Sequence, residues 1–129
     1  AFSPVTLLED CVASTVAAMT RAGVARLVIV SAATLFPDER LSFRFFQWLL
    51  KHQIRDLDAT ENIVRATDLE WTIARPGKLT QSPDEAYRAE AGKLPANGKF
   101  SMSFRAVAAF MLDAVEQHTF VRQVVGLVS

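Results

Sequence analysis

Apolar residues recur at two different spacings along the chain, and the two spacings predict alternating helices and strands. In residues 7–22 the apolar side chains return every three or four positions, as on one buried face of a helix. Thr6 and Glu9 have the spacing of a capping box at the start of this segment. Gly23 follows it, as a glycine does after many helices. The pattern therefore predicts a helix over residues 7–22.

Two short segments are apolar on both faces, which is typical of strands in a parallel sheet covered by helices. They are residues 26–32 (RLVIVSA) and residues 71–74 (WTIA). Between them, residues 42–66 have apolar positions every three to four residues, which predicts one long helix or two helices end to end. Because helices and buried strands alternate, we predict an α/β fold with a short, mainly parallel sheet.

After the second buried strand, the sequence becomes richer in residues that favour turns and loops. Pro76 cannot donate to a sheet ladder, so this strand is expected to end near Arg75. Residues 80–98 are richer in Pro, Gly, Ser, Asp and Asn, and they predict a long excursion that holds at most one short strand.

The last thirty residues predict two strands around a helix. Residues 99–102 can pair locally as a strand. Ser103 is expected to cap a helix that runs to about Gln117, with its apolar positions on one face. Residues 120–128 are mostly apolar and predict a final strand.

Composition and charge narrow the function classes. The chain has 129 residues, of which 50% are hydrophobic and 22% charged, so one folded domain over residues 1–129 is expected. Its 14 basic and 14 acidic residues cancel, which does not support nucleic-acid binding. No apolar run approaches the roughly 20 residues that span a bilayer, so we expect no membrane partner. Cys11 is the single cysteine, and no signal peptide is visible, which favours a cytoplasmic location.

Several segments, taken in order, resemble a known family. These segments are ARLVIVSAA, RDLDATENIVRATDLEWTIARPGKLT, AYRAEAG, SFRAVAAFMLDAVE and VVGLVS. Their order and spacing resemble the atypical short-chain dehydrogenase/reductases, and more narrowly the NAD(P)H-binding group of flavin-reductase-like, biliverdin-reductase-like and NmrA-like proteins. The resemblance covers nearly the whole chain, and ENIVRATDLEWTIARPG is its most specific part.

The resemblance implies a Rossmann-like three-layer fold, of which this chain matches the C-terminal half only. The family holds the cofactor's pyrophosphate on a glycine-rich turn at a helix N-terminus. The five glycines of this chain lie too far apart to form such a turn: Gly23, Gly77, Gly92, Gly98 and Gly126. We therefore expect a truncated member that lacks the N-terminal βαβ nucleotide-binding half.

The resemblance also places the nicotinamide end of NADP or NAD at the carboxyl ends of two strands. Ser31 matches the serine that ends one family strand near the nicotinamide, and it is the only candidate for a catalytic role. The segment whose backbone matches the second contact consists of Arg75, Pro76, Gly77, Lys78 and Leu79. Each has a structural alternative: Ser31 as a small strand-end residue, Pro76-Gly77 as a strand-to-loop turn, and Lys78 as a solvated lysine. With the phosphate loop missing, this chain alone could also bind no cofactor.

The family's usual acid catalyst is not expected here. Classical relatives use a Tyr-x-x-x-Lys pair, and the matching positions hold Gln53 and Leu57. Tyr87 is the only tyrosine, and Ala91 stands four residues after it. No His, Cys, Asp and Glu residues have the spacing of a metal site.

Two functions remain open at this point. The first is a part of an NAD(P)H-dependent reductase, with hydride transfer to a small flavin-like or carbonyl substrate once the missing half is supplied. The second is a non-catalytic homodimeric module without cofactor. In the family's sheet order the strand at Leu27–Val30 loses a neighbour, and an apolar free edge favours association. We expect a homodimer through this edge, with the aromatic residues Phe43, Phe46 and Trp48 adding to the contact.

Overall fold

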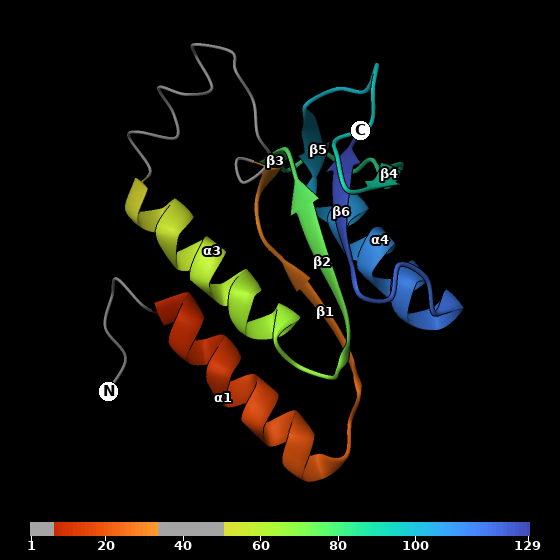
Figure 1. Ribbon diagram of the computed structural model, residues 1–129. Helices are drawn as coiled ribbons and strands as arrows, with labels where there is room; N and C mark the ends of the chain where they lie inside the picture. The colour runs from red at the N-terminus through yellow and green to blue at the C-terminus, as the bar shows by residue number, and fades with distance from the viewer. Residues whose placement is uncertain (1–6, 34–50) are drawn as a thin grey trace. The chain divides into compact units, whose positions relative to one another are not determined.

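The computed structural model describes residues 7–33 and 51–129, which belong to two compact units (Figure 1). The first unit holds two helices, and the second holds one helix and all the strands. In chain order the elements are α1 (Leu7–Ala22), β1 (Arg26–Val30), α3 (Lys51–Arg65), β2 (Glu70–Pro76), β3 (Lys78–Thr80), β4 (Arg88–Ala91), β5 (Ser101–Ser103), α4 (Phe104–Gln117) and β6 (Gln123–Val128). Phe43, Phe46 and Trp48 lie outside the described residues.

Helices α1 and α3 lie side by side in the first unit (Figure 1). The buried Asp56 of α3 accepts hydrogen bonds from the backbone N–H groups of Leu8 (3.2 Å) and Glu9 (3.1 Å). A carboxylate at these positions satisfies first-turn amides and complements the positive end of the helix dipole. Thr6, the expected cap, lies outside the described residues, so Asp56 is the cap that the structure shows.

The end of α1 is as predicted, and Val12, Val16 and Met19 form its more buried face. Gly23 has φ +73°, the left-handed conformation of a glycine that terminates a helix. Cys11 lies beside this face and is exposed. The two helices are not long and apolar enough to cross a bilayer, and the same holds for every helix in the described ranges.

The second unit is built on a four-stranded sheet in the order β1-β2-β6-β4 (Figure 1). β1, β2 and β6 are parallel, and β4 is antiparallel to β6. Two further short strands, β3 and β5, form a small parallel pair. The α/β class and the mainly parallel sheet are therefore confirmed. In the described part of the chain β1 lies at the edge of the sheet, because it pairs with β2 alone.

The core of this unit lies between α4 and the sheet. Ser103 caps α4 as predicted, since its Oγ accepts a hydrogen bond from the backbone N–H of Ala106 at 2.9 Å. The side chains of this core come from one face of α4 and from β2, β5 and β6: Ala106, Val107, Phe110, Ala114, Ala74, Met102, Val125 and Leu127.

Several strand boundaries differ from prediction, and the first is that β1 ends at Val30 rather than at residue 32. β2 continues through Pro76, which lies in register with Leu127 of β6, and the ladder's next donor is the backbone N–H of Gly77. β5 covers residues 101–103 rather than 99–102. β6 begins at Gln123 rather than residue 120, because Phe120 and Arg122 have positive φ angles of 55° and 57°, which a strand cannot contain.

Arg26, the first residue of β1, joins four segments of the second unit. Its Nη1 donates to the carbonyl of Glu70 (2.8 Å) and to Oγ1 of Thr72 (2.9 Å). Its Nη2 donates to the carbonyls of Ala114 (3.1 Å) and Thr119 (2.9 Å). Burial lowers the pKa of Arg26, and the nearby Glu70 charge opposes that shift. The guanidinium thus ties β1 to β2, to the end of α4 and to the loop before β6.

We expect Arg26→Met to lower the free energy of unfolding by about 2–4 kcal/mol, because several buried acceptors lose a charged donor at once. Arg26→Lys should recover only part of this loss, since one ammonium group cannot reach acceptors on both sides. Arg21→Ala, at an exposed position near the end of α1, is the control and should change stability by less than about 0.5 kcal/mol. Urea denaturation followed by circular dichroism measures the free energy of unfolding of all three variants. Equal stabilities of Arg26→Met and Arg21→Ala would show that Arg26 does not tie these segments together.

Candidate functional site

Two of the expected contact segments meet at the carboxyl edge of the sheet. β1 and β2 are parallel with Val30 opposite Ala74, so Ser31 follows the end of β1 at the level of Arg75, which still lies within β2. The backbone N–H of Ser31 donates to the carbonyl of Ala74 at 2.7 Å, which extends the ladder by one bond. The carboxyl ends of adjacent parallel strands are where Rossmann-like sheets bind ligands.

The hydroxyl of Ser31 is the unusual polar group at this edge. Its Oγ is fully buried and has no hydrogen-bond partner among the described residues. An unsatisfied buried hydroxyl costs about 1–3 kcal/mol. A serine with a purely structural role normally has a hydrogen-bond partner when its hydroxyl is buried. A polar group from outside the described residues, such as a ligand atom, would supply the missing hydrogen bond.

The segment after β2 offers little side-chain chemistry. Arg75 and Pro76 are buried, and Gly77 and Leu79 are half-buried. Leu79 packs against the core of the second unit. Lys78 is exposed and is therefore the one residue of the five whose charge faces solvent. Any ligand at this segment would be held mainly by backbone groups.

The packing of the chain alone explains why residue 77 is a glycine, without any bound ligand. A Cβ at this position would lie 1.6 Å from the carbonyl oxygen of Phe100. That same carbonyl accepts a hydrogen bond from the backbone N–H of Lys78 at 3.0 Å. The segment before β5 therefore approaches the turn too closely for any side chain. This favours the strand-to-loop interpretation of Gly77 over a contact with a flat ring.

Tyr87 is held in the packing of α4. Its hydroxyl donates to Oδ2 of Asp113 at 2.6 Å, and its ring meets that of Phe110 edge to face, with centroids 5.5 Å apart. The hydrogen bond to Asp113 raises the pKa of Tyr87 to about 12, and burial and the Asp113 charge act in the same direction. A phenol with this pKa is a poor proton donor near neutral pH.

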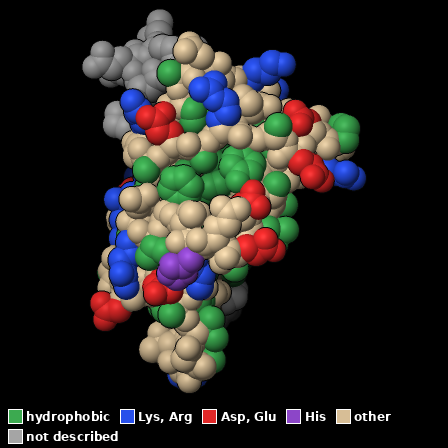
Figure 2. All heavy atoms as spheres, turned by 90° about the vertical axis from the view of Figure 1, so that its right-hand side faces the viewer, with side chains coloured by type: hydrophobic (Ala, Val, Ile, Leu, Met, Phe, Trp, Pro, Cys, Tyr) green, Lys and Arg blue, Asp and Glu red, His purple; other side chains and the backbone are tan. Residues whose placement is uncertain are grey.

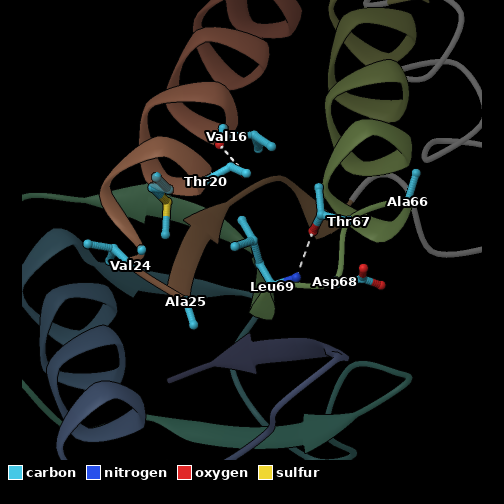
Figure 3. Close-up of a pocket in the computed structure, with 10 residues that line it drawn as sticks. Val16, Thr20, Val24, Ala25, Ala66, Thr67, Asp68 and Leu69 are labelled. Carbon is cyan, nitrogen blue, oxygen red and sulfur yellow. Dashed lines mark hydrogen bonds between the residues drawn. The ribbon is translucent and has the colours of Figure 1, made fainter.

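A hollow of about 480 Å³ lies in the first unit, and no sequence pattern predicts it (Figure 3). Its lining comes from the end of α1 and from the residues just before β1 and β2, away along the chain from Ser31 and Arg75. Its hydroxyls are engaged: Thr20 donates to the carbonyl of Val16, and Thr67 accepts from the backbone N–H of Leu69. Because no convergent polar groups face it, we do not assign chemistry to this hollow.

The described residues at the carboxyl edge of the sheet do not form a metal site. Within residues 7–33 and 51–129, no three His, Cys, Asp or Glu side chains are grouped as ligands of a metal ion. The chemistry that the edge offers is therefore hydrogen bonding from a buried hydroxyl and from backbone groups.

Solved structures share this fold. A short-chain dehydrogenase/reductase from Veillonella parvula is 24% identical, with a TM-score of 0.76, over 94% of this chain and 58% of its own. A second structure with that description and source, in complex with NADP, is 22% identical with a TM-score of 0.73, at the same coverage. A putative NADH-flavin reductase from Streptococcus pneumoniae is 17% identical with a TM-score of 0.74, over 100% of this chain and 68% of its own.

These likenesses establish the fold, and the chain spans 58% of the length of the first two structures. A search of curated proteins gave no match. The sequence profile of a family described as NAD(P)H-binding, in contrast, matches residues 3–118. That match includes both strand ends and the whole of α4. The chain belongs to the NAD(P)H-binding family, as its resemblance to the short-chain dehydrogenase/reductases predicted.

Proposed function

We propose that this chain forms the nicotinamide side of an NAD(P)H-dependent reductase that acts on a small flavin-like or carbonyl substrate. The observation that carries the proposal is the buried, unpartnered hydroxyl of Ser31 at the carboxyl edge of parallel strands. Two likenesses support it: one neighbour was solved with NADP, and another is described as an NADH-flavin reductase.

In this proposal the hydroxyl of Ser31 is the main contact that orients the nicotinamide, and residues 75–79 line the same edge of the sheet. The bound cofactor supplies a hydride to the substrate. Tyr87 is not the proton donor, because its hydroxyl is bonded to Asp113 and its pKa is raised to about 12. The proton that balances the reduction therefore comes from solvent. The similar solved structures are longer than this chain. The elements that hold the cofactor's phosphates would correspond to the part of those structures that this sequence does not span.

The edge position of β1 favours a second candidate, a homodimeric module that binds no cofactor. Here β1 pairs along Leu27–Val30 with its own copy, which would satisfy the open edge. Its apolar side chains are half-buried, and Val30 is 38% exposed. A cytoplasmic location fits either candidate and remains part of the proposal.

Ser31→Ala separates binding from stability. Because the hydroxyl has no partner among the described residues, its removal should leave the free energy of unfolding unchanged or raise it. The same substitution should weaken binding of NADPH by about five- to tenfold, which is the loss of one hydrogen bond. Isothermal titration calorimetry with NADPH, NADH and reduced nicotinamide mononucleotide measures the binding. If the nicotinamide end dominates, all three should bind with similar, weak affinity.

Ser103→Ala is the matched control. It removes the cap of α4 and should cost about 1–2 kcal/mol of stability while leaving cofactor affinity unchanged. If the wild-type chain shows no saturable binding up to millimolar cofactor, the reductase proposal fails for this chain and the homodimeric module is favoured. Equal affinities of wild type and Ser31→Ala would remove Ser31 from the site.

Tyr87 gives a prediction at high pH. Its pKa is raised from the usual value near 10 to about 12 in the folded chain. The interaction with Asp113 therefore stabilises the fold fully below pH 10, and that stabilisation is lost as the pH rises from about 10 to about 12. Since the chain has one tyrosine, tyrosinate absorbance follows this group alone.

We expect the absorbance midpoint near 12 in the native chain and near 10 in denaturant. In wild type the free energy of unfolding should fall between pH 10 and about pH 12 as Tyr87 loses its proton. Tyr87→Phe should lack this contribution to the fall. A native midpoint near 10 would show that the phenol is free and would reopen its role as an acid.

A further inference from the structure

Helix α4 carries a second apolar face whose side chains are about half exposed or more in the described structure. Its buried face meets the sheet, but Phe104, Leu112 and Val115 are 54%, 62% and 49% exposed. Together with the exposed Ala108 they follow the spacing i, i+4, i+8, i+11, so they form one stripe along the helix. Figure 2 shows the side of the second unit on which α4 lies, where apolar side chains gather among charged ones.

Two charges flank this apolar stripe, one near each end of α4. Arg105 stands in the first turn and Glu116 in the last, and helical spacing puts both along the same edge of the stripe. Each has the wrong sign for the helix dipole, which favours acidic groups at the N-terminus and basic groups at the C-terminus. Neither makes an ion pair with another described residue.

We propose that the apolar stripe of α4 binds the same stripe of a second copy, with the two helices antiparallel about a two-fold axis. The axis would pass near residue 110, with Arg105 and Glu116 five and six residues to either side of it. A two-fold axis across an antiparallel pair brings equal edges of the two stripes together. Arg105 then meets the partner's Glu116 twice in each dimer, and each charge also lies beside the helix end that it complements.

The side-chain sizes fit the same arrangement. Ala108 and Leu112 each stand two residues from residue 110, so Leu112 of each copy lies level with the partner's Ala108. A small residue opposite a large one allows close helix packing. The stripe also has flanking charges of both signs, which suits its own copy better than a polyanion or an acidic lipid surface.

The size of the surface sets the expected strength. A 14-residue helix is about 21 Å long and offers less than the roughly 800 Å² per partner of a standard interface. We therefore expect a reversible dimer with a dissociation constant of about 10 µM. This surface is independent of the proposed nicotinamide site and of the β1 edge. If copies also pair along β1, the two contacts together give larger assemblies.

Charge reversal tests the contact. Arg105→Glu and Glu116→Arg should each weaken the α4 contact by at least about tenfold, because each places like charges together twice in the dimer. The double variant Arg105→Glu/Glu116→Arg restores opposite charges and should return the dissociation constant to within about threefold of the wild type. Leu112→Asp should abolish the contact, and Arg21→Glu on α1 is the control that should leave it unchanged. Sedimentation velocity over a concentration series measures each variant.

Unfolding cannot be mistaken for dissociation in this design. Each single reversal improves the match with the helix dipole, so the midpoint of urea unfolding should stay the same or rise while the dimer dissociates. A wild-type chain that stays monomeric up to millimolar concentration would overturn the proposal. So would a dimer that both single variants leave unchanged, which would indicate pairing through β1 or another surface. Failure of the double variant to recover association would also overturn it.

Discussion

The parallel pairing of β1 with β2 is the constraint on which the rest of the second unit depends. It fixes Val30 opposite Ala74, and only in this register does Ser31 follow its strand at the level of Arg75. A slip of one residue would turn every β1 side chain to the other face of the sheet. Arg26 opposes such a slip, because its guanidinium bonds to β2, to the end of α4 and to the loop before β6.

Apolar runs and capping chemistry were enough to predict much of this fold from sequence. The contiguous apolar runs predicted strands at β1 and β2, and Ser103 predicted the start of α4. Of the two strands only β2 is buried, whereas β1 is half-buried and ends in the exposed Val30. What could not be predicted depends on contacts between distant segments. Asp56 caps α1 by accepting from the backbone N–H of Leu8, 48 residues before it in the chain, and the φ angles of Phe120 and Arg122 shorten β6. No local pattern contains either fact.

Contacts between distant segments also changed which residues are the strongest candidates for the functional site. Pro76 and Gly77 were the most visible signal in the sequence, yet Gly77 is required by the approach of Phe100, and Pro76 continues the strand. Ser31 was a weaker signal, and it has the buried hydroxyl without a partner among the described residues. Burial of a single atom depends on the packing around it, so no sequence pattern contains this difference between Ser31 and Gly77. The functional argument therefore rests on Ser31.

The open side of β1 lies next to Ser31, so whether that edge is covered bears directly on the proposed site. Ser31 donates its backbone N–H toward β2, so by alternation the amides of Leu27 and Ile29 also face β2, and those of Val28 and Val30 face the edge. Amide hydrogen exchange measured by NMR, over a range of protein concentrations, tests this directly. We expect slow exchange at Leu27 and Ile29 and fast exchange at Val28 and Val30 in dilute protein. Equal protection of all four amides at every concentration would show that β1 is not an open edge and would contradict this arrangement.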